Sequence, residues 1–114
     1  LDEAEWLPLA EAIAQRARLL NEILGDFYGE QRLLADTKLP PELVFANPNY
    51  LRACQGVPVP GDIRLNFYAA DLARSTDGRW WVLNDRTQVP SGSGYALENR
   101  LVSAQTLSQV FSQC

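Results

Sequence analysis

The dipeptide Asp77-Gly78, which separates two strand-like runs, constrains the fold of this chain most. The run before it, residues 62–74, alternates apolar and polar side chains, and the run after it, residues 79–85, reads RWWVLND. Asp-Gly is a strong hairpin signal because both residues tolerate the backbone geometry of a tight turn. The sequence therefore predicts an antiparallel β-hairpin.

A helical period precedes this hairpin. Between Glu3 and Leu24 apolar side chains recur every three or four residues, which predicts an amphipathic helix. They are Trp6, Leu9, Ala10, Ile13, Ala17, Leu20, Ile23 and Leu24. Pro8 is tolerated only in a first helical turn, so we expect the regular helix to start near Leu7. Gly25 is placed to end it.

Proline and glycine divide the next 30 residues into short pieces. A second helix is predicted at about residues 30–35, and the motif KLPPEL stops it and restarts the chain. Residues 42–56 fit either a short strand or a helical turn. Asn47-Pro48 is typical of a helix entry, which favours a helix from Pro48 to Cys54 that ends at Gly56.

The last segment, from Gly94, is predicted to be a helix. Its candidate core positions are Tyr95, Leu97, Leu101, Val102, Leu107, Val110 and Phe111. The fold class is therefore α+β, with N-terminal helices, an antiparallel hairpin and a C-terminal helix. We interpret residues 1–114 as a single domain or fragment: a helical part over 1–62, the hairpin over 63–90, and a Gly/Ser loop with its helix over 91–114. Because the chain begins at Leu1 rather than Met, we expect it to be a piece of a longer protein.

Charge and cysteine content exclude several classes of protein. A formal charge of −4 argues against a nucleic-acid partner, and no apolar run approaches the roughly 20 residues of a membrane span. Cys54 and Cys114 lack metal or redox spacing, which favours reduced thiols in the cytoplasm over a disulfide. Without histidine, the chain supplies no histidine base or ligand. We expect Arg16, on the first helix, to be solvated or paired with the acidic start of the chain.

Polar side chains gather where the two predicted strands end. Pairing about the turn brings Asp71 level with residues 84–86, which read Asn-Asp-Arg. Carboxylate and amide oxygens suit Mg²⁺, so Asp71 and Asn84 are candidate metal ligands. Arg74 and Arg86 are candidates for neutralising phosphate oxygens. A solvated sheet end with surface ion pairs would give the same pattern.

A glycine-rich loop follows the second strand. Its residues Ser91, Gly92, Ser93 and Gly94 precede a predicted helix, where backbone N–H groups can hold an anion. The spacing matches neither the Walker A motif nor the dinucleotide fingerprint. The alternative is a plain linker with Ser93 near a helix cap.

The stretch DGRWWVLNDRTQVPSGSGYALENR resembles the circularly permuted ATP-grasp proteins of type 2, a bacterial family related at fold level to glutathionylspermidine synthetase. The resemblance runs from about Trp6 to Phe111, and PSGSGYALENR is its most specific part. It implies a ligase that activates a carboxylate as an acyl phosphate and joins it to an amine, with Mg²⁺ bridging the phosphates of ATP. This chain would carry the metal-side hairpin, and the strands that clasp adenine would lie beyond Cys114.

The resemblance also exposes a departure. Family members with an apparently complete site read Glu-Asp-Asn where this chain reads Asn84-Asp85-Arg86. The resemblance implies the glutamate, the asparagine and an aspartate matching Asp71 as metal ligands, and only Asp71 is retained. Asn84 still offers a neutral oxygen, Asp85 should face the other side of the strand, and Arg86 brings a positive charge to the metal position.

Two interpretations follow from this departure. Arg86 replaces the metal as the phosphate-neutralising charge, or ligase chemistry has been lost together with its ATP and Mg²⁺. The leading function is a segment of an ATP-grasp-like carboxylate–amine ligase, inactive in isolation. Its partners are the rest of the parent chain and a small carboxylate and amine. The alternative is a non-catalytic binding or scaffolding module.

Overall fold

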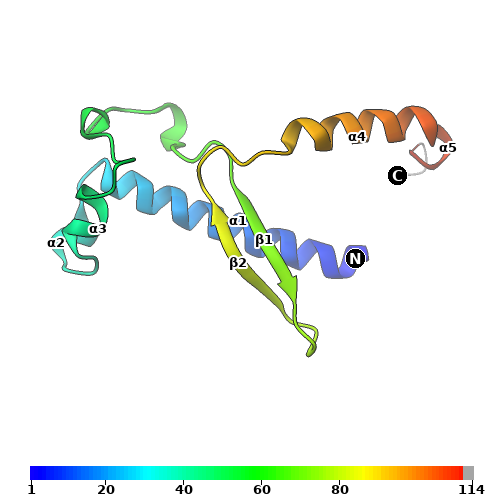
Figure 1. The fold of residues 1–114 in the computed structure, drawn as a ribbon, viewed down its shortest axis with the longest axis horizontal. Coiled ribbons are helices and arrows are strands. Elements are labelled where there is room, and N and C mark those ends of the chain that lie inside the picture. Colours follow the sequence, from blue (N-terminus) through cyan, green and yellow to red (C-terminus); the bar gives the residue numbers. More distant parts are fainter. Residues whose placement is uncertain (112–114) are drawn as a thin grey trace.

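The computed structural model describes residues 1–111, without the side chain of Phe111, and its architecture is α+β (Figure 1). A long helix α1 is followed by two short helices, a β-hairpin and a C-terminal helical arm. The helices and strands are α1 (Glu3–Phe27), α2 (Arg32–Ala35), α3 (Pro41–Phe45), β1 (Ala69–Arg74), β2 (Trp80–Arg86), α4 (Ser93–Thr106) and α5 (Ser108–Phe111), with 3₁₀ turns at Arg52–Cys54 and Pro60–Asp62. The predicted fold class is confirmed.

Helix α1 begins earlier than the sequence predicts, at Glu3 rather than near Leu7. The Asp2 carboxylate accepts the N–H of Glu5 at 2.8 Å, and this N-cap starts the helix ahead of Pro8, which therefore lies inside it. Seven of the eight predicted apolar positions are partly buried, and Trp6 is the exposed exception. The helix also continues past Gly25, because the N–H of Tyr28 still reaches the carbonyl of Leu24 at 3.2 Å.

Short helices and turns pack at the C-terminal end of α1. Helix α2 starts at Arg32, where both oxygens of the Asp26 carboxylate accept backbone N–H groups. Of the predicted helix from Pro48 to Cys54, only the 3₁₀ turn at Arg52–Cys54 forms. The side-chain oxygen of Asn47 accepts the N–H of Asn49 at 2.9 Å and closes a tight turn in its place.

The predicted hairpin is confirmed, and its turn lies at the predicted position. The N–H of Ser75 reaches the carbonyl of Arg79 at 2.9 Å, and Gly78 has the positive φ of 85° that the turn needs. The first strand is shorter than its sequence pattern, since residues 63–68 have no strand beside them. Instead, the Asn21 side-chain oxygen on α1 accepts the N–H groups of Arg64 and Leu65.

A β-bulge interrupts the hairpin. Asp71 pairs with Asn84 and Leu72 pairs with Val82, so the pairing skips Leu83. Opposite residues point to the same side of a sheet. Val82 and Asp85 therefore share the side toward α1, while Asn84 and Arg86 share the outer side with Asp71.

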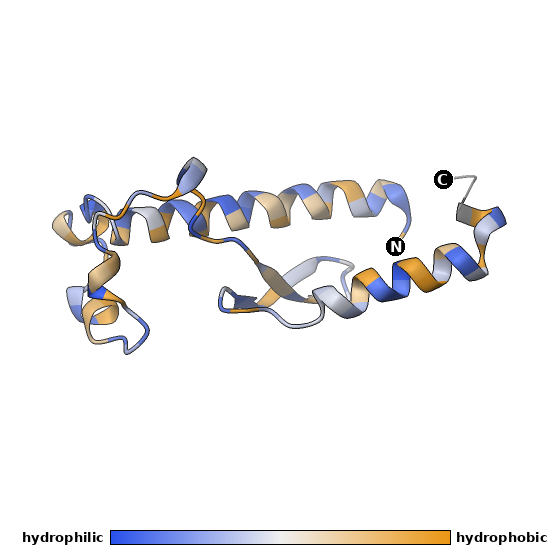
Figure 2. Cartoon of the chain, turned by 90° about the horizontal axis from the view of Figure 1, so that it is seen from above, coloured by the Kyte–Doolittle hydropathy of each residue, from blue (hydrophilic) through white to orange (hydrophobic). Residues whose placement is uncertain are grey.

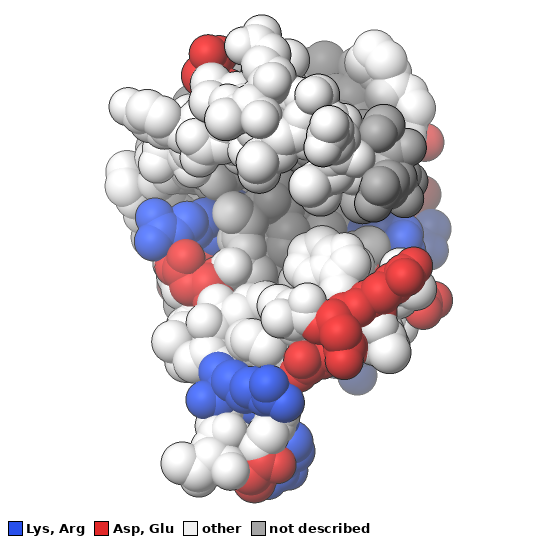
Figure 3. Space-filling view, turned by 90° about the vertical axis from the view of Figure 1, so that its right-hand side faces the viewer, with Lys and Arg blue, Asp and Glu red and all other residues white. Residues whose placement is uncertain are grey.

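The C-terminal arm stands away from the body of the molecule, and α4 makes its main contacts with α5 (Figures 1 and 2). Its predicted core positions are therefore wrong for this chain: Tyr95, Leu97, Leu101, Val102, Leu107 and Val110 are all exposed. The prediction for the side chain of Phe111 falls outside the described part. Figure 3 shows few charged side chains on the arm, in contrast to the hairpin and the start of α1 below it.

The molecule is extended. Its radius of gyration is 18.5 Å, whereas a compact chain of this length has about 13 Å. Its accessible surface of 9247 Å² exceeds by about 3,000 Å² that of a compact protein of the same mass. Val44, 6% exposed, is the one buried apolar residue in the described part. No closed core forms among these residues.

Two further expectations concern cysteine and membranes. Cys54 is a partly buried free thiol, and Cys114, its candidate disulfide partner, lies outside the described residues. Among the helices of residues 1–111, none has the length and hydropathy needed to cross a bilayer.

Candidate functional site

Three of the predicted site residues meet on the outer side of the hairpin. The Nε of Arg86 donates to both oxygens of Asp71, at 3.1 and 3.0 Å, and its Nη2 lies 2.9 Å from Oδ2. The side-chain amide of Asn84 donates to the same Oδ2 at 3.3 Å. The register that the sequence predicts around Asp71 is therefore confirmed.

The electrostatics of this cluster, which we call the outer cluster (Asp71, Asn84 and Arg86), follow from its contacts. Hydrogen bonds from Arg86 first and Asn84 second hold the pKa of Asp71 below its ordinary value. The carboxylate raises the pKa of Arg86 in return. Both side chains are about half exposed, 41% for Asp71 and 52% for Arg86, so solvent screens the pair.

Asp85 lies on the opposite side of the strand, as the sequence predicts. It receives a two-pronged contact from Arg16 of α1, with Nε 2.7 Å from Oδ1 and Nη2 2.6 Å from Oδ2. The hydroxyl of Tyr68 donates to Oδ1 at 2.6 Å. These bonds, that of Arg16 first, lower the pKa of Asp85 to about 2. Partial burial, reinforced by the Asp85 carboxylate, raises the pKa of Tyr68.

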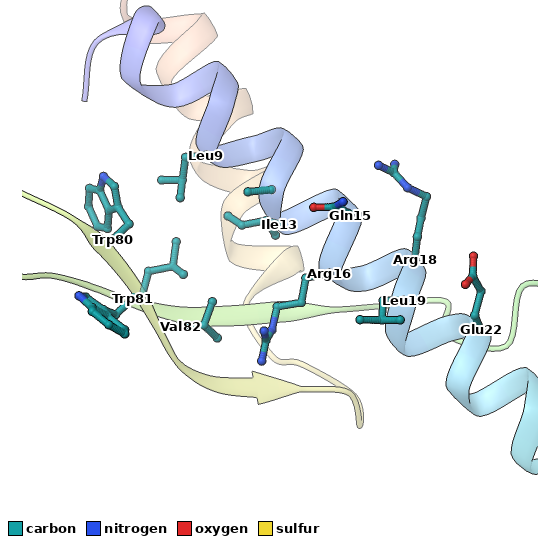
Figure 4. Close-up of a pocket in the computed structure, with 12 residues that line it drawn as sticks. Leu9, Ile13, Gln15, Arg16, Arg18, Leu19, Glu22, Trp80, Trp81 and Val82 are labelled. Atoms are coloured by element: carbon teal, nitrogen blue, oxygen red, sulfur yellow. The ribbon is translucent and has the colours of Figure 1, made fainter. Parts of the chain in front are cut away.

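Arg16 is the residue that sequence reasoning misses. It was expected in solvent or beside the acidic start of the chain, but it points from α1 toward the sheet, while Arg18 points away from it (Figure 4). Its partner lies 69 residues further along, and no local pattern signals such a contact. Around it, α1 and β2 line a hollow of about 670 Å³ with apolar side chains that include Leu9, Ile13 and Val82.

Arg74 does not join the outer cluster. It lies at the turn end of β1 and faces α1, where its Nη2 is 3.0 Å from the Glu5 carboxylate. Its guanidinium also stacks over Trp80, 5.7 Å from the ring centre, and its Nε donates to the carbonyl of Gly78. The two arginines predicted together are therefore separated by the length of the hairpin.

The Gly/Ser loop divides between two places. Ser91 lines a polar hollow of about 400 Å³ at the open end of the hairpin together with Arg86. Gly92, with φ 107°, forms the entry to α4, and Ser93 and Gly94 are its first residues. Asn47 and Asn49 line the same hollow, although no sequence pattern connects them to the strand end. A local Asx turn was the only signal there.

The donor set of the outer cluster is poorly suited to a divalent cation. One carboxylate and one amide oxygen remain for a metal, and the guanidinium already neutralises that carboxylate. In the described residues no group of three or more acidic or thiol side chains is arranged to hold a metal ion. A guanidinium has five donors in a planar fork, more than one carboxylate uses, so Arg86 has the capacity to contact a phosphate oxygen as well.

The fold and the cluster define an α+β module that presents a charged strand end and wide apolar surface. The chain belongs to the circularly permuted ATP-grasp type 2 family, which matches residues 1–114. This bears out the resemblance found in the sequence.

The relatives are considerably longer proteins. An uncharacterised protein of Mycobacterium tuberculosis (strain H37Rv) is 42% identical over 113 residues, covering 99% of this chain and 13% of that protein. One of Synechocystis is 38% identical over 109 residues, covering 96% of this chain and 23% of that protein. One of Mycobacterium leprae is 32% identical over 112 residues, covering 98% of this chain and 20% of that protein. The chain thus spans less than a quarter of the length of these relatives.

Proposed function

We propose that this chain supplies the hairpin on the metal and phosphate side of an ATP-grasp-like carboxylate–amine ligase with a degenerate metal site. Membership of the family supports the ATP-grasp part of this proposal. In such a reaction the carboxylate attacks the terminal phosphate of ATP and ADP leaves. An amine then attacks the acyl carbon of the resulting acyl phosphate, inorganic phosphate leaves, and the amide forms with loss of a proton. Negative charge on phosphate oxygens has to be neutralised throughout, and fixed cationic donors do this well.

The observation that carries the proposal is the outer cluster itself. Asp71 and Asn84 are directly opposite in the pairing, and Arg86 reaches diagonally to the same carboxylate. The cluster holds the guanidinium in place, and Ser91 lines the polar hollow beside it. A positioned guanidinium at the edge of a hollow is suited to a phosphate. Mg²⁺, when bound with ATP, would supply further charge neutralisation, and Asp71 and Asn84 are the residues to contact it.

The second candidate, a non-catalytic binding or scaffolding module, is favoured by one specific contact. Arg86 uses its Nε and Nη2 on Asp71, so the retained acidic ligand is already satisfied by a permanent cation. A metal would have to displace that guanidinium or share the carboxylate with it. A fold kept for assembly alone would tolerate such a pair.

The remaining parts of the proposal concern what surrounds this chain. We place the rest of the nucleotide cleft on the additional length that the relatives have, and the isolated segment would be inactive without it. A small carboxylate and an amine are the proposed substrates. The free thiol of Cys54 is consistent with a cytoplasmic protein, where thiols stay reduced.

Calorimetric titration of the full-length protein with Mg-ATP, and with ATP in EDTA, tests the proposal. Asp71→Asn keeps the shape of the side chain and removes its charge, and Asp36→Asn, at an exposed position after α2, is the matched control. Metal-dependent binding that Asp71→Asn weakens about tenfold supports a ligase that retains its metal. Binding in EDTA that Arg86→Gln weakens supports Arg86 as the substitute charge. Absence of binding in both titrations favours the scaffold.

A further inference from the structure

The bulge at Leu83 decides which side chains meet Asp71. In an unbroken strand alternate residues share a side, so Asn84 and Arg86 would lie with Val82, toward α1. The skipped pairing at Leu83 reverses this order and sends them to the outer side. A bulge leaves one residue out of the regular ladder pairing, so contacts outside the ladder contribute to fixing its position.

The strongest such contact is made by the residue between Asn84 and Arg86. The carboxylate of Asp85 is held on the α1 side by the paired bonds of Arg16, at 2.7 and 2.6 Å, and by the hydroxyl of Tyr68 at 2.6 Å. A two-pronged guanidinium–carboxylate contact fixes orientation as well as distance. With Asp85 fixed inward, its two neighbours have to point outward.

We propose that Arg16 is a positioning residue, which fixes Asp85 against α1, holds the bulge at Leu83 and thereby turns Asn84 and Arg86 toward Asp71. Its effect on a phosphate ligand rests on the proposed function above. Its effect on the outer cluster does not, and is measured without any nucleotide.

A simple tether between α1 and the hairpin is a different role, and the structure separates the two. Glu5 already ties the turn end of the hairpin to α1, through Arg74 at 3.0 Å and the indole N–H of Trp80 at 3.1 Å. Glu5 and Arg16 are about 16 Å apart along the helix. The hairpin therefore keeps an attachment when Arg16 is replaced, and the change should be local to the bulge.

Nuclear magnetic resonance of the full-length protein labelled with ¹⁵N-arginine tests this role. The Nε–Hε signal of Arg86, assigned from Arg86→Lys, reports its bond to Asp71, and Asp71→Ala, which removes the acceptor, gives the position of the unpaired signal. We expect Arg16→Gln to move the Arg86 signal most of the way to that position. Arg18→Gln, on the same helix but pointing away from the sheet, is the matched control and should leave it in place (Figure 4).

Two further variants keep the test decisive. Asp85→Asn has nearly the same shape and should move the Arg86 signal as Arg16→Gln does, and the double variant should add nothing. If Arg16→Gln does not fold, Asp85→Asn carries the test alone. An Arg86 signal that stays at its wild-type position in the folded variants would overturn the positioning role.

Titration with Mg-ATP and with ATP in EDTA then separates this inference from the proposed function. If both hold, Arg16→Gln weakens ATP binding about tenfold while Arg18→Gln does not. If the Arg86 signal moves but the wild-type protein binds no ATP, the positioning role stands and the ligase proposal fails. If the wild-type protein binds ATP but the Arg86 signal does not move in Arg16→Gln, the ligase proposal stands and the positioning role fails.

Discussion

At the scale of single residues, the charge at position 86 governs what the strand end can bind. Arg86 neutralises Asp71 in the present structure, and its positive charge repels any metal cation that approaches the same carboxylate. Because the pair is about half exposed, solvent screens this repulsion. A cation at this position therefore competes with the guanidinium for the same carboxylate.

Restoring the residues of the apparently complete family site should reverse this preference. The double variant Asn84→Glu/Arg86→Asn removes the positive charge and adds a carboxylate opposite Asp71, so we expect Mg²⁺ to bind at least about tenfold more tightly. Calorimetry with Mg²⁺ alone measures the change. Arg79→Asn at the hairpin turn controls for the loss of one positive charge. Equal affinities in wild type and double variant would mean that the geometry of a metal site is gone.

The Arg16–Asp85 pair should make stability depend on pH in acid. The pKa of Asp85 is about 2 in the folded chain and about 3.9 when unfolded, so the stabilisation is complete above about pH 4 and is lost as the pH falls toward 2. We expect the midpoint of thermal unfolding to fall more steeply over that range in wild type than in Asp85→Asn. Tyr68→Phe should be intermediate, since the stronger bond from Arg16 remains. Parallel curves for wild type and Asp85→Asn would contradict this.

At the scale of elements, the hairpin depends on its turn, because the turn sets the register in which Arg74 pairs with Trp80 and Leu72 with Val82, up to the bulge. Gly78 has φ 85°, where a residue with a Cβ is strained by about 1–2 kcal/mol. Space is not the obstacle, since an added Cβ would come no closer than 4.0 Å to the Arg74 guanidinium.

Gly78→Ala should therefore lower the midpoint of thermal unfolding through backbone strain alone. Gly94→Ala is a suitable control, because Gly94 lies in the first turn of α4 with nothing within 4 Å of an added Cβ. We expect the control to be neutral or slightly stabilising. Circular dichroism measures the midpoints of thermal unfolding of both variants. A midpoint of Gly78→Ala equal to that of wild type would show that the turn contributes little to folding.

At the scale of the whole molecule, the dominant fact is surface that remains exposed. The excess of about 3,000 Å² over a compact protein is as large as an obligate interface between subunits. The exposed apolar side chains include several on α4 as well as Trp81 and Leu83 of β2. Burial of this surface against the rest of a longer protein would account for it.

A charge placed on α4 tests that burial. Leu101→Asp should hardly change the stability of the 114-residue chain, in which Leu101 is exposed. In the full-length protein it should destabilise by roughly 3 kcal/mol, the cost of burying an unpaired charge or losing a packed leucine. Thr106→Asp adds the same charge on another side of the helix and is the control. Thermal unfolding measures the effect of Leu101→Asp in the 114-residue chain and in the full-length protein. Equal effects in the two proteins would show that the arm stays exposed.

The sequence by itself determined the local features: the apolar face of α1, the position of the hairpin turn and the region of β2, residues 84–86, that lies level with Asp71. These follow from periodicity and turn chemistry within a few residues, so a linear pattern contains them. The bulge at Leu83 and the bond between Arg16 and Asp85 were decided only by the tertiary structure. They depend on side chains that meet across 69 residues, and no periodicity encodes such a meeting. For the same reason the apolar pattern of α4 predicted a buried face but could not say whether a partner in this chain covers it.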